Sequence, residues 1–123
     1  MAGYLNLLVW QSAMQIAEDI YRLTEKLPKH EMYSLTNQLR RAAISVPFNI
    51  AEGHGRNSPK EFNHFLDIAL GSLSELETQL LLAIRLTYFE ENQLSTLLKT
   101  TDETAKMLQG LKKSLIQKLM TND

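Results

Sequence analysis

The sequence predicts an all-α protein, with residues 1–123 folded as a single domain in an antiparallel up-down-up-down four-helix bundle. Three observations support this prediction. Apolar residues recur at spacings of three and four along four segments, as they do on one face of a helix. No segment alternates for long like a strand, and 5 Gly and 3 Pro are few turn residues for a sandwich or barrel. A chain of 123 residues suits one domain with its own core.

The first predicted helix covers residues 9–27. Pro28 ends it, because the residue before a proline disfavours helical geometry. Charged residues lie off the face that would meet the core. That face carries Trp10, Ala13, Ala17, Ile20, Thr24 and Leu27.

The second predicted helix covers residues 31–53. Pro47 lies inside it and has no N–H for the carbonyl of Ala43, so we expect a kink or an irregular turn there. We expect Gly53-His54-Gly55 to end the helix in the left-handed geometry that glycine accepts without strain. The predicted core face carries Leu35, Leu39, Ala42, Val46 and Ile50.

The third and fourth predicted helices cover residues 58–88 and 91–121. Ser58-Pro59-Lys60-Glu61 forms a capping box, with proline at the first helical position. Further along the third helix, we expect Gly71 and Ser72 to permit the close approach of a neighbouring helix. The core faces carry Phe62, Phe65, Ala69, Leu73, Leu76, Leu80, Ala83 and Thr87 in the third helix, and Leu94, Leu97, Thr101, Leu108, Leu111, Leu115 and Leu119 in the fourth.

The second helix has apolar residues on a second side. At about 100° per residue, Ile44, Pro47, Phe48 and Ala51 project away from its core face. A helix whose outer side faces water would not normally carry such a group. One interpretation is local packing against a neighbouring helix or the N-terminal arm. The other, which we prefer, is an interface between subunits.

The inventory of reactive residues argues against an enzyme. The absence of Cys excludes disulfides, thiolate catalysis and Cys-ligated metals. Glu61 and His64 have the Glu-x-x-His spacing of di-iron bundles, but the second such motif is missing. We therefore expect His64 to be a surface or helix-pairing histidine, with Asp67 one turn later placed to pair with it. No G-x-S-x-G elbow occurs, and the acidic pairs Glu75/Glu77 and Glu90/Glu91 fit solvated surface. We therefore expect no catalysis, metal, cofactor or small-molecule substrate.

The sequence shows neither a targeting segment nor a membrane span. The apolar start, residues 1–10, lacks a basic region and a cleavage pattern. No window reaches the roughly 18 uncharged apolar residues that a span requires. We expect a cytoplasmic protein with no membrane contact.

Basic residues gather in two parts of a nearly neutral chain. With 13 Lys and Arg against 14 Asp and Glu, the net charge of -1 argues against a uniformly basic nucleic-acid binder. In a ring of subunits, however, a small basic patch is multiplied by the subunit number. The candidate anion-binding or nucleic-acid-binding residues are Arg40, Arg41, Arg56 and Lys60 around the second helix, and Lys112, Lys113 and Lys118 in the fourth.

A structural interpretation of the same region is also open. Glu52 would pair with an arginine, and Asn49 would satisfy backbone groups freed by Pro47. The functional alternative uses the free N–H groups at the start of the third helix, where Arg56 and Lys60 could help to hold a phosphate. The sequence alone leaves both interpretations standing.

Four motifs follow one another along the chain: Val9-Trp10-Gln11-x-Ala13-Met14, Gln38-Leu39-Arg40-Arg41-Ala42-Ala43-x-Ser45-Val46-Pro47-x-Asn49-Ile50-Ala51-Glu52-Gly53, Gly55-Arg56-x-Ser58, and Glu61-Phe62-x-x-Phe65-Leu66-x-Ile68-Ala69-x-Gly71-Ser72-Leu73-x-Glu75-Leu76. In these motifs the sequence resembles the four-helix-bundle family named for the 23S ribosomal RNA intervening sequence, over about residues 5–88. The resemblance implies a bacterial protein, a left-handed antiparallel bundle and a homo-oligomer, commonly a pentameric ring. We expect Asn49, Glu52, Gly53 and Ser58, which lie in these motifs, to have a structural role.

The family is similar to the accessory protein of diversity-generating retroelements, a basic pentameric barrel that works with a reverse transcriptase and nucleic acid. Two functional hypotheses follow. In the first, the chain is a non-catalytic homo-oligomeric scaffold that binds RNA. In the alternative, it is a protein–protein interaction module with no nucleic-acid role.

Overall fold

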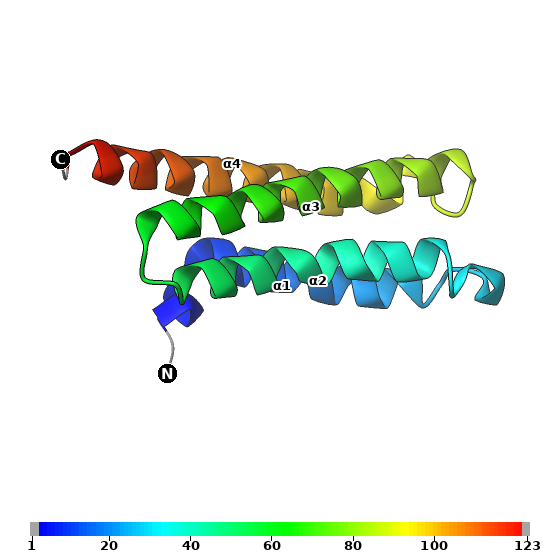
Figure 1. The fold of residues 1–123 in the computed structure, drawn as a ribbon. Helices are drawn as coiled ribbons and strands as arrows, with labels where there is room; N and C mark the ends of the chain where they lie inside the picture. Colours follow the sequence, from blue (N-terminus) through cyan, green and yellow to red (C-terminus); the bar gives the residue numbers. More distant parts are fainter. Residues whose placement is uncertain (1–2, 122–123) are drawn as a thin grey trace.

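The computed structural model describes residues 3–121, which form four α-helices and two short 3-10 helices (Figure 1). The described residues contain no strand, so the predicted all-α class is confirmed, and the helices are consistent with a four-helix bundle. Residues 1–2 and 122–123 of the predicted domain lie outside the described range. The elements are η1 (Gly3–Asn6), α1 (Leu8–Thr24), η2 (Lys29–Glu31), α2 (Leu35–His54), α3 (Pro59–Arg85) and α4 (Glu91–Thr121).

Helices that are neighbours along the chain are also neighbours in space. α2 packs on α1 and α3, α4 packs on α3, and α1 packs on α4. Figure 1 shows the chain passing along the molecule four times, with both described ends at one end of the bundle. We call this the terminal end. The opposite, distal end carries η2 and the connection between α3 and α4 (Figure 1).

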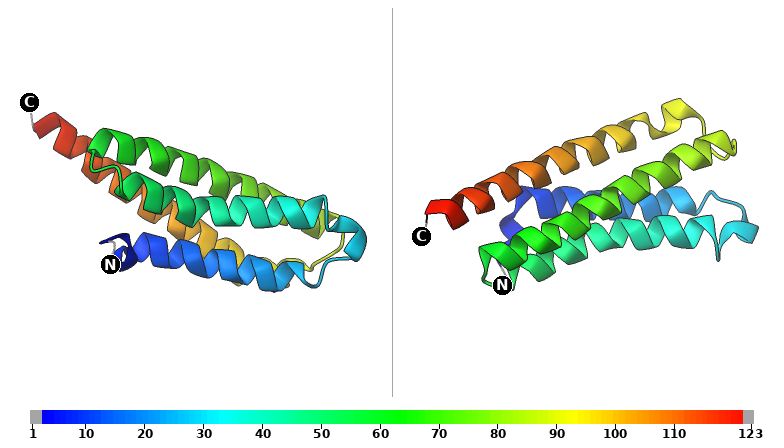
Figure 2. Two further views of the ribbon diagram at one scale, coloured as in Figure 1. Left: turned by 60° about the horizontal axis from the view of Figure 1, so that its bottom comes forward. Right: turned by 45° about the horizontal axis from the view of Figure 1, so that its top comes forward.

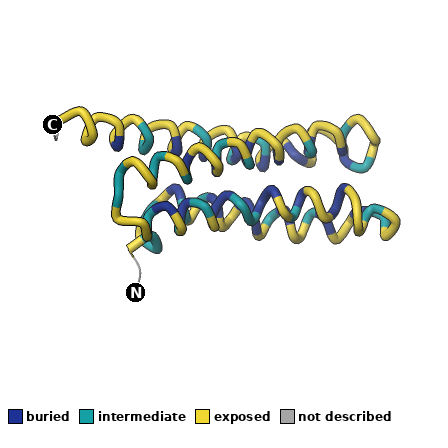
Figure 3. The backbone as a smooth tube through the Cα atoms, in the orientation of Figure 1, coloured by how far each residue is buried: buried dark blue, intermediate teal, exposed yellow. Residues whose placement is uncertain are grey.

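One hydrophobic core runs between the helices, and the buried positions lie on their inner sides (Figure 3). The predicted core face of α1 is corrected in one respect, because Val9 and Ile16 are buried while Trp10 is only half-buried. Apolar spacings of three and four along α1 fit a face that includes Trp10 as well as one that includes Val9 and Ile16. The largest fully buried apolar side chains are Ile16, Ile20, Leu39, Val46, Ile50, Leu66, Leu76, Leu80, Leu94 and Leu108.

A polar contact joins α1 to α4 beside this core. Ser12 Oγ lies 2.7 Å from Thr104 Oγ1, and the two residues are 92 positions apart in the chain. Thr104 is fully buried, and its hydroxyl donates to the Thr100 carbonyl at 2.7 Å. Ser12 is therefore the donor in the pair. Since a buried hydroxyl without a partner is costly, the pair favours one level of α1 against α4.

Two helices end earlier than predicted. α1 ends at Thr24 rather than residue 27, because the next N–H groups bond three residues back instead of four. Leu27 is nevertheless buried in the following turn. α3 ends at Arg85 rather than at residue 88. Two residues later, Thr87 has a left-handed backbone with a φ of 64°. There the Tyr88 N–H turns back onto a carbonyl of α3 at 3.0 Å.

α2 begins later than predicted, at Leu35 rather than residue 31. Residues 29–31 form η2 instead. The Glu31 carboxylate accepts a hydrogen bond from the Ser34 hydroxyl and a longer one, 3.4 Å, from the Leu35 N–H. Glu31 thus satisfies the start of α2 from outside the helix, where backbone donors lack intrahelical partners.

The end of α2 corrects the predicted role of its glycines. The helix continues without interruption through Pro47, and Gly55 beyond it has a φ of -72°. The left-handed residue of the turn is Asn57, with a φ of 56°. Gly53 is buried instead, and a Cβ atom there would lie 2.7 Å from the Cβ of Phe65. α2 therefore ends within the predicted Gly53-His54-Gly55 segment, with Gly55 as its C-cap, but the predicted left-handed geometry is wrong. Glycine at position 53 instead allows α3 to pack closely.

The two small residues Gly71 and Ser72 of α3 differ in environment. The Ser72 hydroxyl donates to Ser45 Oγ of α2 at 2.8 Å. Gly71 is exposed, and a Cβ atom there would meet no atom within 4 Å. The expected close approach therefore applies to Ser72 and not to Gly71.

The last turns of α4 extend past the other helices at the terminal end, as two views of the bundle show (Figures 1 and 2). The apolar spacing of α4 continues beyond the point where neighbouring helices cover it. Ile116, Leu119 and Met120 are consequently exposed. The tube in Figure 3 shows the same loss of burial toward the end of α4.

Candidate functional site

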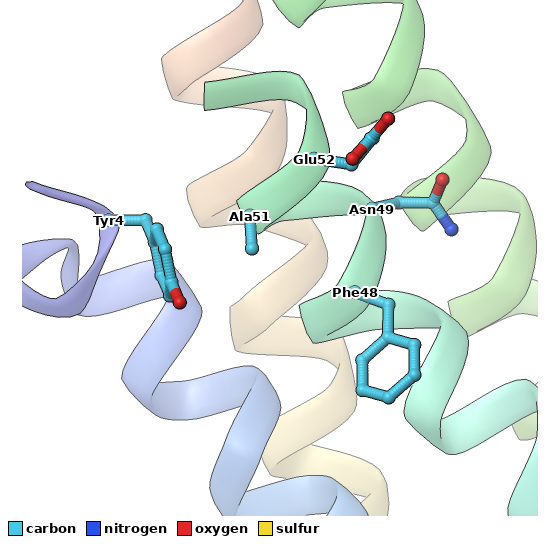
Figure 4. A pocket seen from close by; sticks show the side chains of 5 residues that line it. All are labelled: Tyr4, Phe48, Asn49, Ala51 and Glu52. Atoms are coloured by element: carbon cyan, nitrogen blue, oxygen red, sulfur yellow. The ribbon is translucent and has the colours of Figure 1, made fainter. Parts of the chain in front are cut away.

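An apolar surface lies on the outer side of α2. We call Tyr4, Ile44, Phe48 and Ala51 the Phe48 surface. An open hollow of about 600 Å³ separates Tyr4 of η1 from Phe48 and Ala51 of α2 (Figure 4). Asn49 and Glu52, which also line the hollow, point away from Tyr4 toward α3 (Figure 4). Phe48 is 65% exposed, which is unusual for a large aromatic side chain held on a helix.

The structure separates the four predicted interface residues. Pro47 is buried within the chain, so its assignment to an outer surface is wrong. Ile44 and Ala51 are half-buried, because α2 also packs on α1 and η1. The Tyr4 ring rests edge-on against Trp10, 5.2 Å between centroids, which helps to hold η1 in place. Local packing with the N-terminal arm thus covers part of this side and leaves Phe48 open.

A polar network joins α2 to α3. The Asn49 amide donates to the Ser45 carbonyl at 2.7 Å and to Ser45 Oγ at 3.0 Å. The expected satisfaction of groups freed by Pro47 is therefore not seen, because the bonded carbonyl is that of Ser45 and not of Ala43. Ser45 Oγ also accepts the Ser72 hydroxyl. The network lies beside a groove of about 310 Å³, which Arg41 and Glu75 also line.

Arg56 lies among acidic and aromatic side chains at the terminal end. Its guanidinium donates to Glu52 at 2.7 Å, lies 3.9 Å from a Glu61 oxygen, and lies 5.2 Å from the centre of the Phe65 ring. The expected pairing of Glu52 with an arginine is present. Ser58 Oγ accepts the Glu61 N–H at 3.3 Å, as the capping box predicts. Two carboxylates thus offset the charge that the predicted anion corner would use.

The predicted basic residues do not form one patch. Arg40 donates to Thr24 Oγ1 at 2.8 Å and lies over the Tyr21 ring. Lys112 pairs with Asp67, which we had expected to pair with His64. Arg41 and Arg56 are separated by about 20 Å of helix at 1.5 Å per residue. Lys60, at the start of α3, and Lys113 and Lys118, toward the end of α4, are exposed on the parts of these helices nearest the terminal end.

A second polar cluster, at the distal end, has no counterpart among the predicted sites. The Tyr88 hydroxyl donates to Glu31 Oε2 at 2.6 Å, and His30 Nε2 lies 3.3 Å from the Tyr88 oxygen. Hydrogen bonds from Ser34 and then Tyr88 lower the pKa of Glu31. The hydrogen bond to Glu31 raises the pKa of Tyr88. The cluster joins the α1–α2 connection to the α3–α4 connection.

The described part of the chain contains neither a cluster of metal-ligand residues nor a membrane-spanning helix. Within residues 3–121, no three His, Cys, Asp or Glu side chains gather to form a potential metal site. Over the same range, none of the helices combines the length and the apolar character needed to cross a membrane. His64 lies edge-on to Phe65, with 5.4 Å between ring centroids.

A sequence model described as "23S rRNA-intervening sequence protein" matches residues 5–110, most of the chain. The chain belongs to the 23S rRNA-intervening sequence protein family. The match confirms the resemblance and includes the Phe48 surface except Tyr4, together with the distal cluster. The last turns of α4 lie outside it.

A solved structure is also similar to this member of the 23S rRNA-intervening sequence protein family. It is a protein of unknown function from the S23 ribosomal protein family of Bacteroides thetaiotaomicron. The two chains are 27% identical, the match covers 86% of this chain and 99% of the other, and the TM-score is 0.80. No curated protein matches the chain.

In this family member, Tyr88→Phe is expected to lower the melting temperature at neutral pH and to have little effect in acid. The lowered pKa of Glu31 means that folding favours its carboxylate form. The resulting stability is present above the unfolded-state pKa of about 4.3 and is lost as the pH falls through the lowered pKa. The measurement is the melting temperature of native and variant chains at about pH 7 and about pH 3.

Tyr33→Phe is the matched control for this substitution, because Tyr33 is 94% exposed and belongs to the same end of the bundle. It should leave the melting temperature unchanged at both pH values. If Tyr88→Phe lowers the melting temperature equally at both, the hydrogen bond to ionised Glu31 is not the source of its effect.

Proposed function

We propose that this chain is a non-catalytic subunit of a homo-oligomeric scaffold, in which copies of an antiparallel up-down-up-down bundle join through the Phe48 surface. The assembly is a ring, and five is the subunit number that the family resemblance implies. The observation that carries the proposal is the exposure of Phe48 between half-buried Ile44 and Ala51. Burying such a side chain fully is worth about 1.5–3 kcal/mol.

The apolar character continues from the Phe48 surface onto α1. Tyr4 contacts Trp10, and Met14, one turn later on the same side of α1, is 43% exposed. A stable interface usually buries about 800 Å² on each partner, more than one phenylalanine provides. The continuity with α1 supplies neighbouring apolar area for a second copy to cover.

The electrostatics of the distal cluster support the non-catalytic part of the proposal. A general acid or base works best with a pKa near the working pH. The pKa of Glu31 is lowered and that of Tyr88 is raised, so both pKa values lie further from neutral pH than usual. Their hydrogen bond fits a structural connection between two loops.

The molar mass of the native chain in solution tests the proposal. A defined multiple of 14.1 kDa that persists on dilution into the micromolar range supports it. A single chain at every concentration contradicts it. The corresponding substitution, Phe48→Glu, has the larger effect and is treated in the Discussion.

Nucleic-acid binding is a second candidate function, favoured by the lysines at the terminal end. Lys60 and Lys113 form no ion pair with any residue between 3 and 121, whereas Arg56 and Lys112 pair with carboxylates. In a ring whose subunits point the same way, these lysines would repeat around one rim. Such a rim would attract a phosphate backbone although the chain is nearly neutral.

Replacing Lys60 and Lys113 together with Ala is expected to weaken binding of single-stranded RNA about tenfold at low salt. Each lost phosphate contact should also reduce the slope of log affinity against log salt by about 0.7. The measurement is fluorescence anisotropy of a labelled RNA across a salt series. A matched variant, Lys26→Ala with Lys29→Ala, removes the same charge near the distal end. Equal weakening by both variants would show that overall charge, not the terminal end, governs binding.

A further inference from the structure

A pocket of about 330 Å³ opens at the terminal end of the bundle, on a different part of the surface from the Phe48 surface. The segment before α1, the end of α2, the start of α3 and the last turns of α4 all contribute to it. Its apolar lining includes Leu7, Phe62, Leu111 and Leu115. Leu115 belongs to the buried core, and the other three side chains are half-buried and pack against it, so the pocket is an open hollow at the edge of the core.

The ionisable side chains that line this pocket are all basic. Lys118 and His54 line it, and none of its described lining residues is acidic. Lys118 forms no ion pair with a residue in the range 3–121, unlike Lys112 one and a half turns earlier. The His54 ring is held edge-on to Phe62, with 5.7 Å between centroids. Asn57 and Ser114 add neutral hydrogen-bonding groups.

The size and lining of the pocket define the ligand that would fit it. A cavity of about 150 Å³ accommodates benzene, and the volume of this pocket is roughly twice that of such a cavity. It therefore has room for an apolar group larger than benzene. Ligand pockets in bundles combine an apolar lining with a few polar groups that fix orientation. Here a cation stands at the rim, and an uncompensated lysine favours an anionic head.

We propose that this pocket binds a small amphipathic carboxylate, with an alkyl chain of about eight to ten carbons. The carboxylate pairs with the Lys118 ammonium, and the chain lies against Leu7, Phe62, Leu111 and Leu115. Inorganic phosphate lacks the apolar body and a neutral alcohol lacks the head, so neither satisfies both parts of the site.

The test is a titration of the full chain with decanoate, followed through backbone amide signals by NMR. Saturable shifts are expected for Leu7, Phe62 and Ser114. Lys118→Gln should weaken decanoate binding about tenfold, the loss expected for one charge-assisted contact. Lys113→Gln, the matched control, changes the same charge on α4 outside this pocket and should leave the affinity unchanged. Both lysines are exposed, so neither variant is expected to disturb folding.

Decanol and inorganic phosphate complete the experiment. Native chain should bind decanol about tenfold more weakly than decanoate, and Lys118→Gln should remove that difference. The proposal is overturned if decanoate causes no saturable shifts at these residues, if phosphate binds as well as decanoate, or if Lys113→Gln weakens binding as much as Lys118→Gln. It is also overturned if Lys118→Gln leaves decanoate affinity unchanged.

Discussion

Phe48→Glu is expected to convert the proposed assembly into single chains of 14.1 kDa that retain their helices. In a single chain Phe48 is 65% exposed, so a glutamate there remains in water and changes stability little. In the interface the same carboxylate would be buried without a partner. The penalty is about 3 kcal/mol or more for each interface, which weakens association by more than about a hundredfold.

Light scattering combined with size-exclusion chromatography measures this result, and circular dichroism checks that the helices persist. Tyr33→Glu is the matched control, because it places the same charge at an aromatic position that is 94% exposed and outside the Phe48 surface. It should leave the molar mass unchanged. An unchanged mass for Phe48→Glu would place the interface elsewhere. Equal dissociation by both variants would indicate a general effect of added charge.

Gly53→Ala and Gly71→Ala are expected to change stability in opposite directions. At position 53, the new Cβ would lie 2.7 Å from Phe65 Cβ and 3.0 Å from Phe62 Cδ1. Phe65 Cβ is fixed to its backbone, so relief requires α2 and α3 to move apart. Such overpacking costs about 1–3 kcal/mol.

At position 71, the same methyl group meets no atom within 4 Å. Alanine lowers the entropy of the unfolded chain and favours the helix, so Gly71→Ala should stabilise by about 0.4–1 kcal/mol. Urea unfolding at one chain concentration measures both variants, since assembly contributes to apparent stability. If Gly53→Ala is as stable as the native chain, α2 and α3 are not held as closely as their contact indicates. If Gly71→Ala destabilises, something outside the chain packs against Gly71.

The helices could be predicted because local signals specify them. The Ser58 capping box and the spacing of Leu66, Leu73 and Leu80 follow directly from residues a few positions apart. Local signals do not distinguish the core face of α1, because apolar residues in register with Trp10 and with Val9 both fit a helical period. Packing on α2 and α4 decides between them, and those contacts come from distant parts of the chain.

The functional residues were harder to predict, because their partners are remote in sequence. Glu31 and Tyr88 are 57 positions apart, and neither has a periodic signal. Lys112 and Asp67 are 45 positions apart. Whether Lys112 is free or paired therefore depends on how α3 is aligned with α4, which the sequence does not show. Phe48 differs, since its place opposite the core face follows from helical spacing alone. The pocket at the terminal end depends on where four helices end relative to one another.

The contact between Ser12 and Thr104 has a consequence for how the protein is made. Because 92 positions separate the two residues, α1 cannot gain its contact with α4 until α4 itself has been synthesised. Until then, the faces of α1 and α3 that α4 covers remain in water, while α2 already has both of its neighbours. The nascent chain thus passes through a three-helix stage whose exposed apolar groove is filled by α4, the last of the four described helices to be synthesised.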